Sequence, residues 1–262
     1  MAGWEPYAPP EDTLLRAFVT CWTTFNETIS SATGGVCLRR DDLVATNLGR
    51  PADFFNQVTF LAPLLPSRLD GLMEELTNFY RGVDAGDVYM FSPWPSPDLR
   101  PYGWHLKGHP PLMLRPAGNA PQRPSSLIIE EVRTAEELEL FQELIIRGFP
   151  LEALEPSPAG TFMDISTLQD DRLRCWIGYR DDQPVSASSM FGHSGINNVT
   201  LVATLPDARG HGFGEALAWQ ATCADSKLPA MLISSDLGRP VYERMGYLPL
   251  LRLTVWTRPF TG

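Results

Sequence analysis

The chain has 262 residues, of which 44% are hydrophobic and 20% charged, enough to bury a sizeable core in one large domain or two ordinary ones. Its formal net charge of −10 at pH 7 argues against nucleic acid and against an anionic membrane surface as the main partner, because both attract a basic face. The same charge would suit a cationic amine as a small partner.

The cysteines and the first residues limit further which class of protein this chain can belong to. Cys21, Cys37, Cys175 and Cys223 lie far apart and form no C-x-x-C, so they predict neither a disulfide framework nor a metal site. Residues 1–6 lack the basic and apolar regions of a signal peptide, and no apolar run approaches the ~20 residues that span a bilayer. We therefore expect a cytoplasmic protein with reduced thiols and no metal.

The first half predicts an alternation of helices and strands. Between Asp12 and Ser30 apolar residues recur at helical spacing, and Trp22 belongs to that stripe, which favours a core position for it. Ser67 and Asp70 resemble a capping box at the start of a second helix. The expected elements are a helix at 12–30, strand pieces at 36–46, a strand at 56–61, a helix at 67–81 and a strand at 88–91.

Residues 115–126 are rich in proline, glycine and serine and have the composition of an exposed linker. We therefore expect a first domain at 1–118, a linker at 119–126 and a second domain at 127–262.

The second domain opens with a strand at 127–129. A capping box formed by Thr134 and Glu137 then begins a helix that ends at Gly148. The irregular stretch at 150–171 is expected to form a variable wall of a substrate pocket. The elements that follow are a strand at 175–179, a turn at 181–183, a strand at 185–191 and a second turn at 192–195.

The next element is a glycine-rich turn, Arg209-Gly210-His211-Gly212-Phe213-Gly214, between an apolar strand at 201–204 and a helix. Its glycines let the backbone approach a ligand closely, and the unpaired first amides and the dipole of the helix favour an anion. Arg209 adds a full positive charge. The turn therefore predicts a pyrophosphate site, although such glycines can also serve only a tight connection.

The spacing of these glycines excludes two better-known phosphate motifs. Glu215 stands where the third glycine of G-x-G-x-x-G would fall, and no Gly-Lys-Ser/Thr is present. The turn is therefore neither a dinucleotide-binding fingerprint nor a Walker loop.

A second motif lies downstream. An apolar strand at 231–235 precedes Gly238-Arg239-Pro240-Val241-Tyr242-Glu243-Arg244-Met245-Gly246-Tyr247, in which Pro240 fits the start of a short helix and Gly246 the position past its end. The two motifs, in this order, resemble the coenzyme A-binding core of the GNAT superfamily of acyl-CoA-dependent N-acyltransferases. The resemblance covers about residues 127–258.

The resemblance implies an α/β (α+β) fold in which a mixed, twisted sheet is flanked by helices. The first half repeats the order of strand, helix and strand, followed by an Arg-Pro pair with a tyrosine close behind it. Its turn at 62–66, however, contains two prolines and no glycine. We infer two tandem GNAT-like copies of which the first is degenerate. A chance similarity of two α/β segments is the alternative.

The resemblance also implies roles for single residues, with acetyl-CoA (coenzyme A) as co-substrate. The strand would pair with the pantetheine arm, the Val202 amide would polarise the thioester carbonyl, and the turn would hold the pyrophosphate. Tyr242 would protonate the departing thiolate or, alternatively, pack beneath the cofactor. The implied cofactor-binding residues are Leu201, Val202, Ala203, Thr204, Arg209, Gly210, His211, Gly212, Phe213, Gly214 and Tyr242, and the implied catalytic residues are Tyr242, Val202 and Asp236.

The general base stays open. No carboxylate lies between Ile196 and Thr204, where some members of the superfamily carry a glutamate, and Asp236 and His193 are the nearest candidates. For His211 we favour an exposed loop position without a catalytic duty.

The predicted function is that of an N-acetyltransferase that acts on a primary amine of a small molecule or peptide. The alternative is a non-catalytic acyl-CoA sensor that kept the pyrophosphate site but lost turnover. We expect the acceptor pocket to be built from 150–171, the turn at 192–195 and the first domain. Neither nucleic acid nor membrane is an expected partner, and a homodimer is left open.

Overall fold

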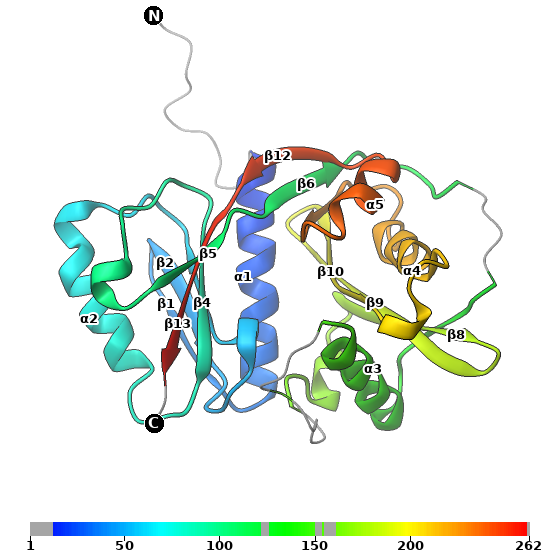
Figure 1. Ribbon diagram of the computed structural model, residues 1–262, viewed down its shortest axis with the longest axis horizontal. Coiled ribbons are helices and arrows are strands. Elements are labelled where there is room, and N and C mark those ends of the chain that lie inside the picture. The colour runs from blue at the N-terminus through cyan, green and yellow to red at the C-terminus, as the bar shows by residue number, and fades with distance from the viewer. Residues whose placement is uncertain (1–12, 122–125, 150–153, 155–160, 261–262) are drawn as a thin grey trace, which may run out of the picture.

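Two mixed β-sheets stand side by side, with the long helix α1 (Leu14–Ala32) between them (Figure 1). The computed structural model describes residues 13–121, 126–149, 154 and 161–260. In that part of the chain no helix combines the length and apolar character needed to cross a bilayer. Each sheet has its own helix on the outer side, and α1 contacts strands of both sheets.

The first sheet has six strands in the spatial order β1-β2-β3-β4-β13-β5. All its neighbours are antiparallel except β3 and β4. Helix α2 (Leu69–Phe79) packs its apolar face on this sheet. The strands are β1 (Val36–Arg39), β2 (Leu43–Asn47), β3 (Gln57–Phe60), β4 (Gly86–Ser92), β5 (His105–Gly108) and β13 (Thr254–Phe260).

The second sheet has seven strands in the order β7-β8-β9-β10-β11-β6-β12, again with one parallel pair, β10 and β11. Side chains alternate along β8, so Cys175 and Ile177 face the core formed with α1 and α3, whereas Trp176 faces α4. The strands are β6 (Pro111–Arg115), β7 (Ile128–Glu131), β8 (Leu173–Arg180), β9 (Gln183–His193), β10 (Ile196–Thr204), β11 (Ala230–Ile233) and β12 (Leu248–Arg252). The helices are α3 (Ala135–Gly148), α4 (Phe213–Thr222) and α5 (Arg239–Arg244).

The last strand of each half belongs to the sheet of the other half. After β5 the chain crosses at His109 and Pro110 into the second sheet, where β6 inserts between β11 and β12. After β12 it crosses at Leu253 into the first sheet, where β13 inserts between β4 and β5. The two crossings lie together, because the Leu253 amide donates to the Pro110 carbonyl at 3.0 Å. We call β5–β6 and β12–β13 together the crossed ribbon (Figure 1).

With this exchange, the six strands of the first sheet have the same order as six strands of the second, in which β7 is an additional edge strand. The series β1, β2, β3, β4, β13, β5 matches β8, β9, β10, β11, β6, β12, and in each series the third and fourth strands form the parallel pair. Helix α2 joins one parallel pair and α4 the other. The predicted α/β class, with mixed sheets flanked by helices in a tandem arrangement, is therefore confirmed. That the first copy is degenerate stays a prediction.

The domain division at 1–118, 119–126 and 127–262 also stays a prediction, and two strands cross it. β6 precedes the expected linker but pairs with β11 and β12, and β13 follows it but pairs with β4 and β5. The linker residues 122–125 lie outside the described residues.

Local signals in the sequence differ in how well they place the helix starts. The capping box of α3 is confirmed: the Glu137 amide donates to Thr134 Oγ1 at 3.2 Å and the Thr134 amide to Glu137 Oε2 at 3.0 Å. The prediction of a capping box at Ser67 and Asp70 is wrong, because a 3-10 turn over Pro66–Arg68 moves the start of α2 to Leu69. The Asp70 carboxylate instead accepts a hydrogen bond from the Tyr102 hydroxyl.

The exchange of strands predicts that the second half does not fold alone. A fragment of residues 120–262 lacks β6 and carries β13, whose buried Val255, Trp256 and Phe260 would have no sheet to cover. We expect this fragment to be insoluble, because it exposes unpaired edges beside β11 and β12 together with an apolar strand. Soluble yield and size-exclusion chromatography measure this, with the full chain as control.

Co-expression of residues 1–119 should restore soluble 120–262 as a complex, since it returns β6 and the partners of β13. A soluble, monodisperse 120–262 fragment with the melting temperature of the full chain would contradict the expectation.

Candidate functional site

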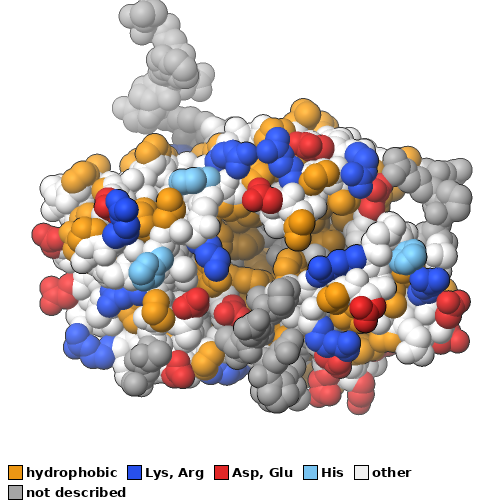
Figure 2. Space-filling model, viewed as in Figure 1, with side chains coloured by type: hydrophobic (Ala, Val, Ile, Leu, Met, Phe, Trp, Pro, Cys, Tyr) orange, Lys and Arg blue, Asp and Glu red, His pale blue; other side chains and the backbone are white. Residues whose placement is uncertain are grey.

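A cavity of about 750 Å³ opens between the two halves (Figure 2). Its lining comes from β10, the end of β11, α5, the crossed ribbon, α1, the loop before β3, β4 and the end of α3. Both halves therefore contribute to one site. The lining residues are Trp22, Phe54, Tyr89, Phe91, Lys107, Gly108, His109, Pro110, Phe149, Val199, Thr200, Leu201, Val202, Ile233, Ser234, Ser235, Asp236, Gly238, Tyr242, Arg252 and Val255.

The cavity lies where the parallel strands β10 and β11 part. Their ladder contains two pairs, Asn197 with Ala230 and Asn198 with Met231. Beyond these pairs β10 runs on to Thr204, while the chain after β11 turns away into α5. Backbone groups of β10 that face this gap have no β11 partner, so they can pair with an extended ligand.

A bulge in β10 adds to this opening. The register with β9 shifts between Thr200 and Ala203, and Leu201 between them has φ of 51°. A positive φ in a residue other than glycine costs ~1–3 kcal/mol and persists only where the surroundings impose it. The buried Leu201 side chain anchors it in the core. Leu201 and Val202 both line the cavity, at the point where a bulge leaves backbone groups unpaired.

The glycine-rich turn follows β10 after a short 3-10 turn at Pro206–Ala208. Gly210 and Gly212 have φ of 82° and 79°, and a Cβ at either would meet no atom within 4 Å, so backbone conformation rather than space requires glycine there. Gly212 is the N-cap residue of α4 and has no side chain to satisfy the first amides of the helix. The turn itself does not line the cavity, and residues 203–208 connect it to Val202, which does.

Arg209 and His211 have different positions in this turn. The Arg209 guanidinium donates to the carbonyls of Thr204 at 3.2 Å and Gly148 at 2.9 Å, so it ties the turn to β10 and to the end of α3. His211 is exposed and stacks on the buried Phe213, with ring centroids 5.5 Å apart.

Helix α5 brings Tyr242 to the cavity. Ser235 Oγ accepts from the Gly238 amide at 3.1 Å, and Gly246 with φ of 88° ends the helix, as the sequence predicts. The ring of Tyr242 packs edge-on against Tyr247 at 5.6 Å, and no hydrogen bond among the described residues engages its hydroxyl. Burial raises the pKa of Tyr242 above its usual value, so the phenol is protonated at neutral pH.

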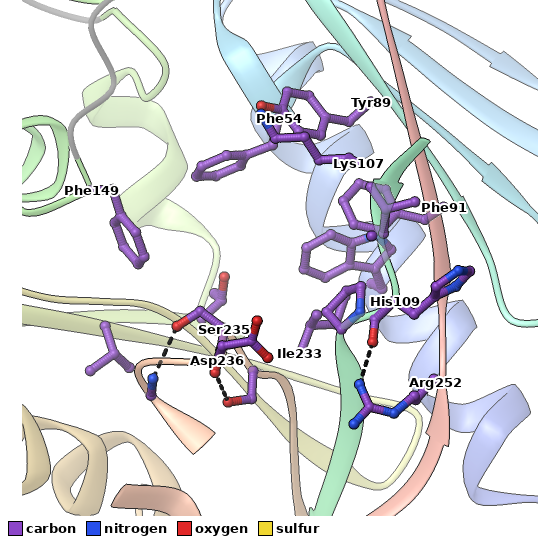
Figure 3. Close-up of a pocket in the computed structure, with 18 of the residues that line it drawn as sticks. Phe54, Tyr89, Phe91, Lys107, His109, Phe149, Ile233, Ser235, Asp236 and Arg252 are labelled. Carbon is purple, nitrogen blue, oxygen red and sulfur yellow. Dashed lines mark hydrogen bonds between the residues drawn. The ribbon is translucent and has the colours of Figure 1, made fainter. Parts of the chain in front are cut away.

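The two candidate bases lie in different places. Asp236 is exposed at the end of β11 and lines the cavity near Ser235 (Figure 3). His193 lies at the end of β9, where its ring contacts Phe191, and is not part of the lining. The structure thus brings Asp236, Tyr242 and Val202 to one cavity.

Sequence reasoning missed the residues that the first half contributes. Trp22 was expected in the core and is indeed buried, with its Nε1 donating to Gln57 at 3.0 Å, but it also lines the cavity. Phe54 lies before β3, Tyr89 and Phe91 lie on β4, and no motif in the sequence marks them. The expected wall at 192–195 does not line the cavity. Of the other expected wall, 150–171, residues 150–153 and 155–160 lie outside the described residues, and the described remainder does not line the cavity.

Comparison with known proteins finds no matching family model and no matching curated protein. Solved structures do match. A GCN5-related N-acetyltransferase from Kribbella flavida is 17% identical, with a TM-score of 0.66 over 91% of this chain and 95% of that one. A conserved protein of unknown function from Staphylococcus epidermidis is 14% identical, with a TM-score of 0.60 over 86% and 94%.

A GCN5-related N-acetyltransferase from Sphaerobacter thermophilus is 14% identical, with a TM-score of 0.52 over 84% of this chain and 78% of that one. At these identities the likenesses show the fold and not the reaction. They confirm the fold that the two sequence motifs predict, and they extend over both halves of the chain.

The need for glycine in this turn can be tested by measuring the stability of the protein. Gly212→Ala should lower the free energy of unfolding by ~1 kcal/mol, because alanine is strained at a φ of 79°. Gly71→Ala in α2 is the matched control, since its Cβ also meets open space but in a helical backbone, and it should stabilise the protein by ~0.5–1 kcal/mol. Urea denaturation measures both. Equal effects of the two substitutions would show that the turn does not depend on the conformational freedom of glycine.

Proposed function

Because the chain has the fold of the GCN5-related N-acetyltransferases, we propose that it transfers the acetyl group of acetyl-CoA to a primary amine of a small molecule or peptide. This proposal rests on three features of the second half taken together. The parted strands β10 and β11 and the side chain of Tyr242 line the cavity, and the glycine turn at the start of α4 lies farther along the chain from the same strand β10.

The three parts of acetyl-CoA fit these features. The amides of the turn at 209–214, with the dipole of α4 behind them, suit the pyrophosphate. The edge of β10 at 201–204 offers backbone groups to the amides of the pantetheine arm, and the thioester then reaches the cavity. No metal enters this scheme.

The residues around the thioester provide the chemistry. Acetyl-CoA supplies an activated carbonyl that an amine can attack directly. The amide of Val202 donates to the carbonyl oxygen as negative charge develops on it. When the carbon–sulfur bond breaks, the neutral phenol of Tyr242 gives its proton to the thiolate.

The incoming amine must lose a proton before and during its attack. Asp236 is the one carboxylate among the described residues that line the cavity. We therefore assign to it the role of general base, which accepts the proton of the amine directly or through a water. The products are the acetylated amine and free coenzyme A.

The pyrophosphate site predicts a loss of binding on substitution. Gly212→Glu should abolish acetyl-CoA binding, because the carboxylate would stand among the amides and repel the anion. Gly34→Glu is the matched control: Gly34 also has a positive φ, 75°, and open space around it, but lies in the first half after α1. Calorimetry measures both. Binding to Gly212→Glu within about threefold of the wild type, a difference of ~0.6 kcal/mol, would contradict the assignment.

The acid role predicts a loss of turnover. Tyr242→Phe should lower kcat by about 10- to 1,000-fold and leave acetyl-CoA affinity nearly unchanged, because the hydroxyl acts mainly as the thiolate leaves. Tyr102→Phe, which removes a hydroxyl remote from the cavity, serves as control. Release of free thiol under single-turnover conditions measures the chemical step. An unchanged single-turnover rate in Tyr242→Phe would leave this side chain as packing beneath the cofactor.

A non-catalytic acyl-CoA sensor remains the competing function. It would bind acetyl-CoA with the wild-type dependence on Gly212, yet release no coenzyme A with any amine. A screen of amines by thiol release therefore separates an enzyme from a sensor.

A further inference from the structure

Five aromatic side chains form a continuous surface on one side of the cavity. Neighbouring rings contact each other in series: Trp22 with Phe91 at 5.5 Å, Phe91 with Tyr89 at 6.4 Å, Tyr89 with Phe54 at 6.4 Å and Phe54 with Phe149 at 6.3 Å between centroids. We call this set the aromatic wall. Four of its five members come from the first half, on α1, the loop before β3, and β4.

Part of the aromatic wall lies across the cavity from the candidate base Asp236. In Figure 3, Phe54 and Tyr89 lie at one side of the cavity, whereas Ser235 and Asp236 lie at the other. An acetyl group is too small to need such a surface. The space in front of the wall is therefore free for the second substrate.

The charge of the lining does not suit a polycation. The charged side chains that line the described cavity are Lys107, Arg252 and Asp236, so cations outnumber carboxylates although the whole chain has a net charge of −10. Burial and, to a smaller extent, the nearby Asp53 and Asp87 raise the pKa of Tyr89 to about 12, but these two aspartates are not part of the lining. A substrate with several ammonium groups would meet Lys107 and Arg252 without enough carboxylates to balance them.

We propose that the acceptor is a monoamine with an aromatic or similarly large apolar body, which packs on the aromatic wall and points its amine toward Asp236 and Tyr242. The proposal rests on the acetyltransferase function proposed above and names its substrate class. It also gives the first half a role, since its rings select the acceptor.

Binding tests the proposal without turnover. The protein saturated with coenzyme A is titrated with three amines: 2-phenylethylamine, ethylamine and spermidine. We expect 2-phenylethylamine to bind at least about tenfold more tightly than the other two, because its phenyl ring buries apolar area on the wall. Equal affinities, or tighter binding of spermidine, would overturn the proposal.

Two phenylalanines of similar partial exposure provide a matched pair of variants. Phe54→Ala removes a ring from the aromatic wall, and Phe79→Ala removes one from α2, away from the cavity. Phe54→Ala should weaken 2-phenylethylamine binding by at least about fivefold and leave ethylamine and coenzyme A binding unchanged, whereas Phe79→Ala should change none of them. An equal loss for both amines in Phe54→Ala would overturn the proposal.

Turnover separates this inference from the function on which it rests. If acetyl-CoA and 2-phenylethylamine give no free coenzyme A although the amine binds as expected, the acetyltransferase function falls and the aromatic ligand stands. If ethylamine or spermidine is acetylated as efficiently as 2-phenylethylamine, the function stands and the aromatic acceptor falls. If Phe54→Ala instead impairs use of phenylacetyl-CoA and not of 2-phenylethylamine, the wall holds the acyl group and the proposal is wrong.

Discussion

The parting of β10 from β11 is the constraint on which the rest of the site depends. In the interior of a sheet every backbone group is normally paired, so a gap between parallel strands must be held open. Three features act here: the bulge at Leu201, the turn of the chain into α5 after β11, and the glycine turn that carries β10 into α4. The backbone strain at Leu201 is offset by the burial of its side chain in the core shared with α1.

The cavity belongs to both halves, and its charge differs from that of the molecule. The second half supplies the parted strands and Tyr242, and the first half supplies most of the aromatic rings. The whole chain has a net charge of −10, whereas the lining has Lys107 and Arg252 against Asp236. Overall charge is therefore a poor guide to the charge of the cavity, and the sequence-based expectation of a cationic amine stays a prediction.

Features that depend on neighbouring residues were predictable from the sequence, and features that depend on distant ones were not. The capping box at Thr134, the glycine turn and the ends of α5 follow from local rules of backbone conformation. The start of α2 was missed because Pro66 opens a 3-10 turn that competes with the expected cap. The strand exchange joins segments more than 100 residues apart, such as β4 and β13, and the aromatic wall joins residues that no local pattern connects, such as Phe54 and Phe149. No spacing in the chain records which sheet β6 or β13 enters.

The strand exchange also sets an order of events during synthesis. The first sheet needs β13 between β4 and β5, so residues 36–108 cannot complete their sheet until the last residues of the described chain have been made. Until then β4 and β5 present open edges on the nascent protein, with the apolar surface that Trp256 later covers. The first half of the protein to leave the ribosome is thus among the last parts to become native, and its exposure to chaperones and proteases lasts as long as translation of the second half.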